Sequence, residues 1–224
     1  MSSRDAILAR IRSSLNVDAS DIGRRAVVSD RLQRPDRGLI PTRGQLDHVA
    51  RVDLFQAMAE KVSATVTRVT SAADIPAAIA NFLRAKNLPQ RIRHGEDPLI
   101  TGLDWASQPQ MTVTTGPSAG GDLASVSHAF GAVAESGTVV LTSGRDNPTT
   151  LNFLPEYHVV VVEASDIAGD YETIWNRVRA AYGKGTMPRT VNMVTGPSRS
   201  GDIEQTLLLG AHGPRSLHIV IVDG

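Results

Sequence analysis

Hydrophobic residues recur at helical spacing near the start of the chain, and the pattern then stops. In residues 3–15 they fall at Ile7, Leu8, Ile11 and Leu15, which predicts a short amphipathic helix. Residues 16–43 show no such period and contain two prolines, six arginines and four aspartates. We predict an extended, solvated arm there, because the charges nearly cancel. We therefore divide the chain into an N-terminal helix and arm, residues 1–43, and a main domain, residues 44–224. The apolar stripe of the helix should bury against that domain or against a partner.

Helical and strand patterns alternate through this main domain. Residues 46–62 have a helical period, and Ser71 with Asp74 forms a capping box that opens a helix running to Leu83. Further strands are predicted at residues 65–70, 90–93, 111–114, 138–143, 158–164, 190–195 and 217–222, and further helices at 171–182 and 202–208. The continuous valines at 159–162 are typical of a strand covered on both faces. Together these patterns predict an open three-layer α/β domain with a mostly parallel sheet, whose ligands bind at the carboxyl ends of the strands.

Composition and charge remove several classes of function. Lys+Arg and Asp+Glu are balanced at 23 each, so no net field attracts the chain to nucleic acid or to an anionic membrane. Apolar runs are far shorter than the ~20 residues of a membrane span, and no secretory signal is visible at the N-terminus. We therefore expect a cytoplasmic protein. The absence of cysteine excludes disulfides, a thiolate nucleophile and any cysteine-ligated zinc or iron–sulfur cluster.

The histidines and glycines lack the spacings of common cofactor sites. The six histidines form no HxH, HxxxH or HExxH pattern, so no metal site is expected. The sequence also has no nucleotide-binding P-loop and no GxGxxG motif after a strand. We therefore expect this chain to bind no cofactor of its own.

The turn after the strand at 190–195 is the strongest candidate for binding a ligand. Gly196-Pro197-Ser198 would lead from that strand into the helix at 202–208, and a helix N-terminus attracts anions through its N–H groups and dipole. Arg199 could clamp such an anion, although capping alone would explain the serine. A second glycine-rich turn carries His212, for which a structural role fits as well as a functional one. The ligand-binding residues expected here are Gly196, Pro197, Ser198, Arg199, Asp202, Glu204, His212 and Gly213.

A second group of candidates surrounds the strand at 138–143. Glu135, just before it, could act as a general base or nucleophile, or could simply brace the turn through backbone N–H groups. Ser143 and Gly144 end the strand, where glycine permits close approach of a ligand. Gly137 and Thr138 complete the expected ligand-binding set. We expect Glu135 and Gly144 to share one edge of the sheet with the Gly196 and His212 turns.

Several segments, taken together, resemble the LUD domain and in particular the lactate-utilisation protein C family. They are residues 134–141, 154–161, 195–204 and 210–218, and residues 4–12 are similar to the start of that family. The resemblance covers residues 110–223 most strongly. Two positions depart from the family pattern. Ser136 replaces the usual threonine, and Thr149 stands where an arginine usually follows Pro148, which weakens the case for a second cation at the anion site.

The resemblance implies a cytoplasmic bacterial protein that works with iron–sulfur oxidoreductase subunits in oxidising L-lactate to pyruvate. It also implies the fold of the sugar-phosphate isomerase and CoA-transferase group. The leading hypothesis is a subunit that binds a small carboxylate or phosphate and docks through its N-terminal helix, which also leaves room for homo-oligomers. The alternative is a stand-alone isomerase or acyl/CoA-transferase-like enzyme that uses Glu135. A regulatory sensor would need a DNA-binding element, and no basic helix-turn-helix pattern is visible.

Overall fold

The computed structural model describes residues 2–18, 20–34, 37–203 and 206–224, with only the backbone described at 201–203 and 206–208. The chain divides into two compact units, Met1–Leu39 and Ile40–Gly224. The boundary predicted from the sequence lies slightly later, at residue 43. Among the helices of the described residues, none combines the length and the apolar character needed to cross a bilayer.

The N-terminal unit contains two helices where the sequence predicted one. Helix α1 (Ser3–Ser14) begins at a capping box between Ser2 and Asp5, and α2 (Ile22–Gln33) begins at Asp21, whose carboxylate accepts from the Arg24 N–H. The prediction of an extended arm was therefore wrong over α2. Capping and the pairing of Asp30 with Arg34 at 2.9 Å favour this helix, although its apolar residues form no clear stripe. None of the described residues of α1 or α2 is buried.

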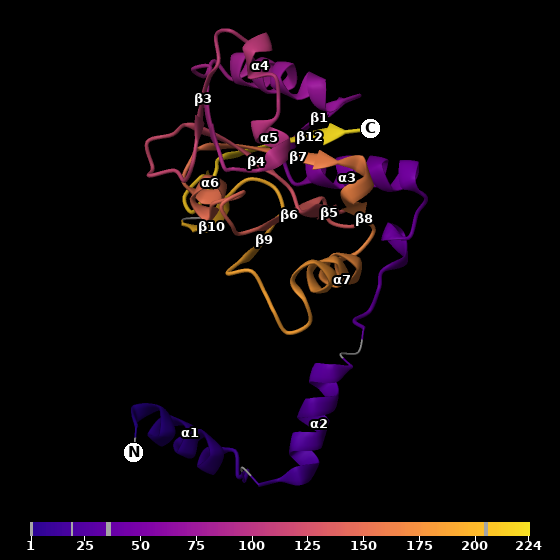
Figure 1. Ribbon diagram of the computed structural model, residues 1–224, viewed down its shortest axis with the longest axis vertical. Helices are drawn as coiled ribbons and strands as arrows, with labels where there is room; N and C mark the ends of the chain where they lie inside the picture. Colours follow the sequence, from indigo (N-terminus) through magenta and orange to yellow (C-terminus); the bar gives the residue numbers. More distant parts are fainter. Residues whose placement is uncertain (1, 19, 35–36, 204–205) are drawn as a thin grey trace. The chain divides into compact units, whose positions relative to one another are not determined.

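A six-stranded, fully parallel sheet forms the centre of the second unit (Figure 1). Its strands, in spatial order, are β1 (Thr65–Val69), β12 (Ser216–Val222), β7 (Tyr157–Glu163), β4 (Ala124–His128), β2 (Arg91–His94) and β3 (Thr112–Thr115). The predicted α/β class with a mostly parallel sheet is thus confirmed. Every strand of this sheet ends at the same edge, because all the pairings are parallel.

Both faces of the parallel sheet are covered, which explains the run of four valines in β7. Val159 and Val161 pack with Ile79 and Leu83 of α4 (Ile75–Ala85) on one face. Val160 and Val162 face the other way and pack with Phe55 of α3 (His48–Lys61). Because side chains alternate along a strand, a strand buried on both faces needs apolar residues at every position. Shorter helices at the strand ends are α5 (Pro98–Thr101) and α6 (Thr149–Phe153).

A second, four-stranded sheet packs beyond Val160 and Val162. It contains, in order, β8 (Ile167–Ala168), β5 (Gly131–Val133), β6 (Thr138–Thr142) and β9 (Val191–Val194). Strand β6 is antiparallel to both of its neighbours. Helix α7 (Tyr171–Tyr182) covers the outer face through Ile174, which packs on Val133 and Val140. The predicted strands at 138–143 and 190–195 therefore exist, but they lie outside the parallel sheet.

The helix predicted at 202–208 is wrong. The structure has a hairpin there, in which β10 (Arg199–Ile203) pairs antiparallel with β11 (Thr206–Leu209). Gly201 and the β-branched Ile203 and Thr206 are poor helix formers, and a helix this short does not repay its nucleation cost. Of the residues predicted to bind ligand here, Asp202 is described only by its backbone in β10, and Glu204 lies outside the described residues.

Candidate functional site

The antiparallel pairing of β6 with β9 separates residues that the sequence was expected to bring together. Val139 pairs with Val194 at one end, and Thr142 pairs with Val191 at the other. Gly196 consequently lies near the beginning of β6, whereas Gly144 lies beyond its far end. The expectation of one shared edge for Glu135, Gly144, Gly196 and His212 was therefore wrong. Gly144, Gly196 and His212 instead line two separate cavities, which lie at opposite ends of the central sheet.

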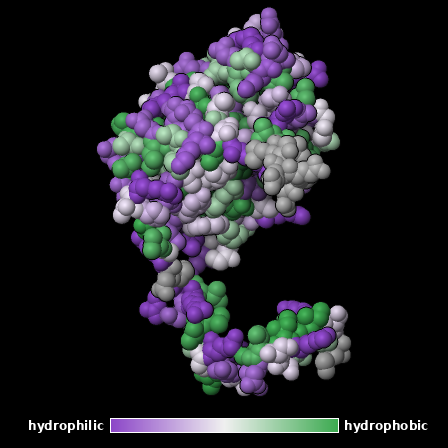
Figure 2. Space-filling view, turned by 180° about the vertical axis from the view of Figure 1, so that it is seen from behind, coloured by the Kyte–Doolittle hydropathy of each residue, from purple (hydrophilic) through white to green (hydrophobic). Residues whose placement is uncertain are grey.

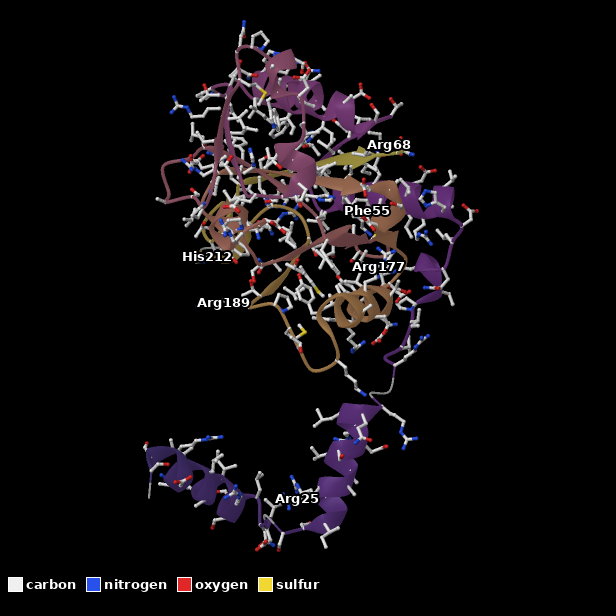
Figure 3. The ribbon with its side chains drawn as sticks, viewed as in Figure 1. Arg25, Phe55, Arg68, Arg177, Arg189 and His212 are labelled. Carbon is white, nitrogen blue, oxygen red and sulfur yellow. The ribbon has the colours of Figure 1, made fainter. Side chains whose placement is uncertain are left out.

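The first cavity, which we call the amino-edge cavity, has a volume of about 290 Å³. It lies before the start of β7 and β12, because α6 precedes β7 and the His212 turn precedes β12; His212 lies next to α6 in Figure 3. Its lining residues are Asn152, Phe153, His158, Met193, Val194, Thr195, Gly196, Pro197, Ser198, Arg199, His212, Gly213, Pro214 and Leu217. Six of the predicted ligand-binding residues thus meet, but at the amino edge and not at the expected carboxyl edge.

Ser198 joins the two glycine-rich turns of this cavity. Its N–H donates to the carbonyl of Pro214 at 2.8 Å, and its hydroxyl accepts from the N–H of His212 at 3.3 Å. Gly196 has a φ of +77°, and a Cβ there would overlap the carbonyl oxygen of Val62. The N–H groups of Ser198 and His212 therefore bond within the two turns. The sequence had predicted free N–H groups at a helix N-terminus instead.

Side chains supply the polar groups that face the amino-edge cavity. The guanidinium of Arg199 donates to the carbonyl of Val62, at the end of α3. Nε2 of His158 lies 3.0 Å from the Ser127 hydroxyl, which donates to Oδ1 of Asn152 at 3.3 Å. Burial lowers the pKa of His158 to about 3, so its ring is neutral near pH 7. Since Ser127 donates to Asn152, it accepts from Nε2–H, and Nδ1 of His158 is an acceptor.

Two buried atoms at this cavity have no hydrogen-bond partner among the described residues. They are Nδ2 of Asn152, a donor, and Nδ1 of His158, an acceptor. Both side chains are almost completely buried, at 1% and 0% exposure. A buried polar group without a partner costs stability, and the usual explanation is a water or a ligand that completes it. Together the two atoms offer a ligand one donor and one acceptor.

Glu135 lies apart from both cavities, on the turn between β5 and β6. It is 4% exposed, and its Oε2 lies 3.8 Å from Nε of Arg43 and has no hydrogen-bond partner among the described residues. The next residues serve the packing of the turn. Gly137 (φ +68°) contacts the backbone of α3, and the Thr138 hydroxyl lies 2.7 Å from that of Thr195 and 2.8 Å from that of Tyr171. The burial of Glu135 and its position apart from both cavities do not suit a base open to substrate.

The second cavity, which we call the carboxyl-edge cavity, has a volume of about 500 Å³. Asp97 follows β2, His128 ends β4 and Asp166 follows β7, so the cavity occupies the edge where parallel α/β sheets commonly bind ligands. Its lining residues are Asp97, His128, Ala129, Phe130, Thr142, Ser143, Gly144, Asp146, Asn147, Asp166 and Tyr182. Ser143 and Gly144 are the predicted site residues that the structure places here.

An Asp–His pair dominates the chemistry of the carboxyl-edge cavity. Oδ2 of Asp97 lies 3.1 Å from Nδ1 of His128. Burial alone would lower the pKa of His128, but the hydrogen bond and charge of Asp97 outweigh it and raise the pKa above its usual value, with help from Glu163 and Asp166. Burial opposes ionisation of Asp97 as well, yet His128 and the N–H groups of α5 leave its pKa lowered. Such a pair can hold a proton or transfer one.

The sequence prediction missed this pair, although a signal for it exists. Both residues stand at the end of a strand of the parallel sheet, where ligand-binding side chains concentrate. The two are 31 positions apart, and nothing in the local pattern links them. Within the part of the chain that the structure describes, no three His, Cys, Asp or Glu side chains gather closely enough to hold a metal ion.

Comparisons with known proteins agree with this fold. Residues 118–222 match the family model of the LUD domain. Lactate utilization protein C of Anoxybacillus flavithermus is 40% identical over 92 residues, which cover 41% of this chain and 40% of that protein. Lactate utilization protein C of Bacillus subtilis is 38% identical over 93 residues, with 41% and 39% covered. The match thus spans about 40% of the length of these relatives.

A solved structure extends the comparison to most of the chain. The crystal structure of a DUF162 family protein from Deinococcus radiodurans superposes with a TM-score of 0.57, covering 80% of this chain and 99% of that one. The two sequences are 23% identical, so this likeness shows a common fold. Residues 118–222 of this chain therefore resemble the LUD domain family, and part of the chain is similar to lactate utilization protein C.

Proposed function

We propose that this chain takes part in bacterial lactate utilisation and binds a small 2-hydroxy carboxylate in the amino-edge cavity. The similarity to lactate utilization protein C supports the first part. One observation carries the second part: the unpartnered Nδ2 of Asn152 shares a cavity with Arg199. The described lining of that cavity contains no Asp or Glu.

The charge of the amino-edge cavity favours an anion. Arg199 keeps further N–H donors beyond the one that it gives to Val62, and guanidinium is the side chain best matched to a carboxylate. The Nδ2–H of Asn152 supplies a neutral donor, and His212 lies on the rim. A carboxylate held between these groups would satisfy a buried donor that otherwise lacks a partner.

The buried histidine adds a preference for a hydroxyl group. Nδ1 of neutral His158 is an acceptor with no described partner, so it suits a ligand O–H. A 2-hydroxy acid carries that O–H beside its carboxylate, whereas a 2-keto acid offers only acceptors there. Lactate should therefore bind more tightly than pyruvate, because a site built to accept from a hydroxyl discriminates against the analogue without one.

The N-terminal unit supports a role among partner proteins. Its apolar side chains are exposed, for example Ile22 at 82% and Leu32 at 72%, and Figure 2 shows hydrophobic surface along this unit. Exposed apolar surface of this kind commonly contacts another protein. We place iron–sulfur oxidoreductase subunits in this position, because oxidation of lactate releases two electrons and a chain without cysteine holds no cysteine-ligated cluster to accept them.

The alternative, a stand-alone isomerase or acyl transferase that uses Glu135, has weaker support. Glu135 is buried against Arg43 and does not line either cavity. A substrate would have to displace the segment around Arg43 to reach it.

Calorimetric titration with L-lactate, pyruvate and inorganic phosphate tests the proposal. We expect lactate to bind best, and Arg199→Gln to weaken binding by about tenfold or more, as for a lost charge-assisted hydrogen bond. Arg189→Gln is the matched control, because Arg189 is also exposed and does not line the amino-edge cavity. Equal losses in both variants, or no binding of any 2-hydroxy acid, would contradict the proposal.

A further inference from the structure

We propose that the carboxyl-edge cavity is a separate binding site for an uncharged ligand with adjacent hydroxyl groups, which Asn147 and His128 hold. This inference goes beyond the proposed function, because it concerns another cavity, which lies at the opposite edge of the sheet and is lined by carboxylates and a histidine. It depends on two unpartnered polar atoms and on the charges around them.

Asn147 supplies a buried acceptor at this cavity. The residue is 5% exposed, and its Nδ2 donates to the carbonyl of Thr142 at 3.4 Å, at the end of β6. Its backbone carbonyl accepts from the N–H of Gly144 at 3.3 Å, so the turn after β6 holds the side chain in place. Oδ1 of Asn147 has no hydrogen-bond partner among the described residues. A ligand O–H or N–H would satisfy this atom.

His128 supplies a second group with a fixed orientation. Asp97 holds Nδ1, and the N–H groups of Leu99 and Ile100 in turn hold the other carboxylate oxygen of Asp97, at 3.0 and 3.3 Å. The remaining nitrogen, Nε2, is buried and has no partner among the described residues. When the ring is neutral, Nε2 is an acceptor, and when it is protonated, Nε2 is a donor. A hydroxyl group can pair with Nε2 in either state.

The surrounding charges disfavour an anion, and two basic side chains offset part of the negative charge that would otherwise attract a cation. They are His128, beside Asp97, and Arg177, whose Nη1 lies 3.5 Å from Oδ1 of Asp166. Asp146 and Asp166 line the same cavity, so a carboxylate or a phosphate would be repelled. A protonated His128 would repel an ammonium group, which moreover has no lone pair for Nε2–H. An uncharged ligand avoids both costs, and its hydroxyl groups can donate to Asn147 and to Asp146.

Aromatic rings form an apolar flank of the cavity. Phe130 and Tyr182 both line it, and their ring centroids lie 6.3 Å apart at a tilt of 39°. Carboxylates and an amide beside aromatic faces suit a ligand whose hydroxyl groups point one way and whose C–H groups point the other. A cavity of about 500 Å³ is large enough for a molecule with several such carbons. These features together favour a polyol.

NMR of the full chain with ¹⁵N-labelled histidine tests the inference. The probes are D-ribose and glycerol as uncharged polyols, putrescine as a cation and L-lactate as an anion. We expect ribose or glycerol to shift the imidazole signals of His128 in a saturable way, and putrescine and lactate to leave them unshifted. The inference is overturned if neither polyol moves these signals, or if one of the ions moves them more strongly.

Paired asparagine variants give the second readout. Asn147→Ala should weaken polyol binding by about tenfold, whereas Asn152→Ala, at the amino-edge cavity, should leave it unchanged. Unchanged binding in a folded Asn147→Ala variant contradicts the inference. If that variant does not fold, His128→Gln decides, because its polyol affinity must fall. Failure of lactate to bind at the amino edge would leave all of these results unaffected, so the two proposals fail separately.

Discussion

Asp97 and His128 form an ion pair that joins the carboxyl ends of two parallel strands, with Oδ2 and Nδ1 3.1 Å apart. Both side chains are mostly buried, at 18% and 21% exposure. The pair therefore connects the stability of the fold with the chemistry of the carboxyl-edge cavity. Its protonation state should change both.

Replacing Asp97 by Asn should lower the pKa of His128, because the carboxylate is what raises it. The stabilising effect of His128 is fully present below its usual pKa of 6.5 and is lost as pH rises through the raised value. The stabilising effect of Asp97 is present above its usual pKa of 3.8 and is lost as the pH falls through the lowered pKa. Asp97→Asn should thus cost about 1–3 kcal/mol near pH 5.

An NMR titration of the imidazole signals, together with urea unfolding at pH 5 and pH 9, measures both effects. Wild-type protein and Asp97→Asn should differ less at pH 9 than at pH 5. A pKa of His128 that is the same in both proteins would contradict this account.

Gly137→Ala should destabilise the fold by at least about 2 kcal/mol. The position combines a φ of +68° with a Cβ that would overlap the backbone of Met58 and Ala59 in α3. Gly144→Ala is the control, because its nearest new contact is an ordinary one, at 3.9 Å from the N atom of Asp146. Chemical unfolding of both variants measures the difference. If Gly137→Ala and Gly144→Ala have the same free energy of unfolding, α3 shifts to accommodate the new Cβ at little cost, which would contradict this prediction.

Two buried histidines should make the fold sensitive to acid. Burial lowers the pKa of His158 to about 3 and that of His218 to about 4. Below their usual pKa of 6.5 the unfolded chain binds protons that the folded chain does not bind, so stability falls as pH decreases from 6.5 towards these values. We expect the free energy of unfolding to fall by several kcal/mol between pH 6.5 and pH 4. The loss is at most about 1.4 kcal/mol per pH unit for each histidine.

Urea unfolding across this range checks the effect, with His218→Gln as the comparison. His218 stacks on Phe82 with centroids 4.2 Å apart, and its Nδ1 lies 2.8 Å from the Thr65 hydroxyl. The variant should be less stable at pH 7 but should lose less stability on acidification. If the free energy of unfolding of His218→Gln falls with decreasing pH as steeply as that of the wild type, His218 does not contribute to the acid sensitivity.

Deleting residues 1–39 should change the free energy of unfolding by less than about 0.5 kcal/mol, because none of the described residues of α1 or α2 is buried. Deleting residues 1–45 should lower the free energy of unfolding by more than the shorter deletion does. That cut also removes Arg43, which pairs with Glu135, and Gln45, whose Nε2 donates to Asp170 at 2.9 Å. Thermal unfolding of the two truncated chains compares them directly.

The shorter deletion also distinguishes the functional hypotheses. If the chain is a docking subunit, removal of residues 1–39 abolishes association with its iron–sulfur partners, and Glu135→Gln has little effect. If it is a stand-alone enzyme, Glu135→Gln abolishes turnover and the deletion is tolerated. Co-purification and turnover assays of both variants give opposite results in the two cases.

Local patterns predicted most of the individual elements correctly. The helical period of residues 46–62, the capping box of Ser71 and Asp74, and the valine run of β7 each reflect interactions among residues close in the chain. The alternation of such elements also identified the α/β class. Where the local pattern was weak, the prediction failed. Helix α2 has no clear apolar stripe, and β10 and β11 pair with each other where a helix was predicted.

The position of the sites depended on contacts between distant segments. Strand β6 looks the same in sequence whether it joins the parallel sheet or pairs antiparallel with β9, yet that choice moves Gly144 to the opposite end from Gly196. Asp97 and His128 meet only because β2 and β4 are neighbours in one sheet. Strand pairing is set by the burial of whole faces, a property of the assembled core. Residue type and local period predict which elements form, but the packing of those elements decides which side chains share a cavity.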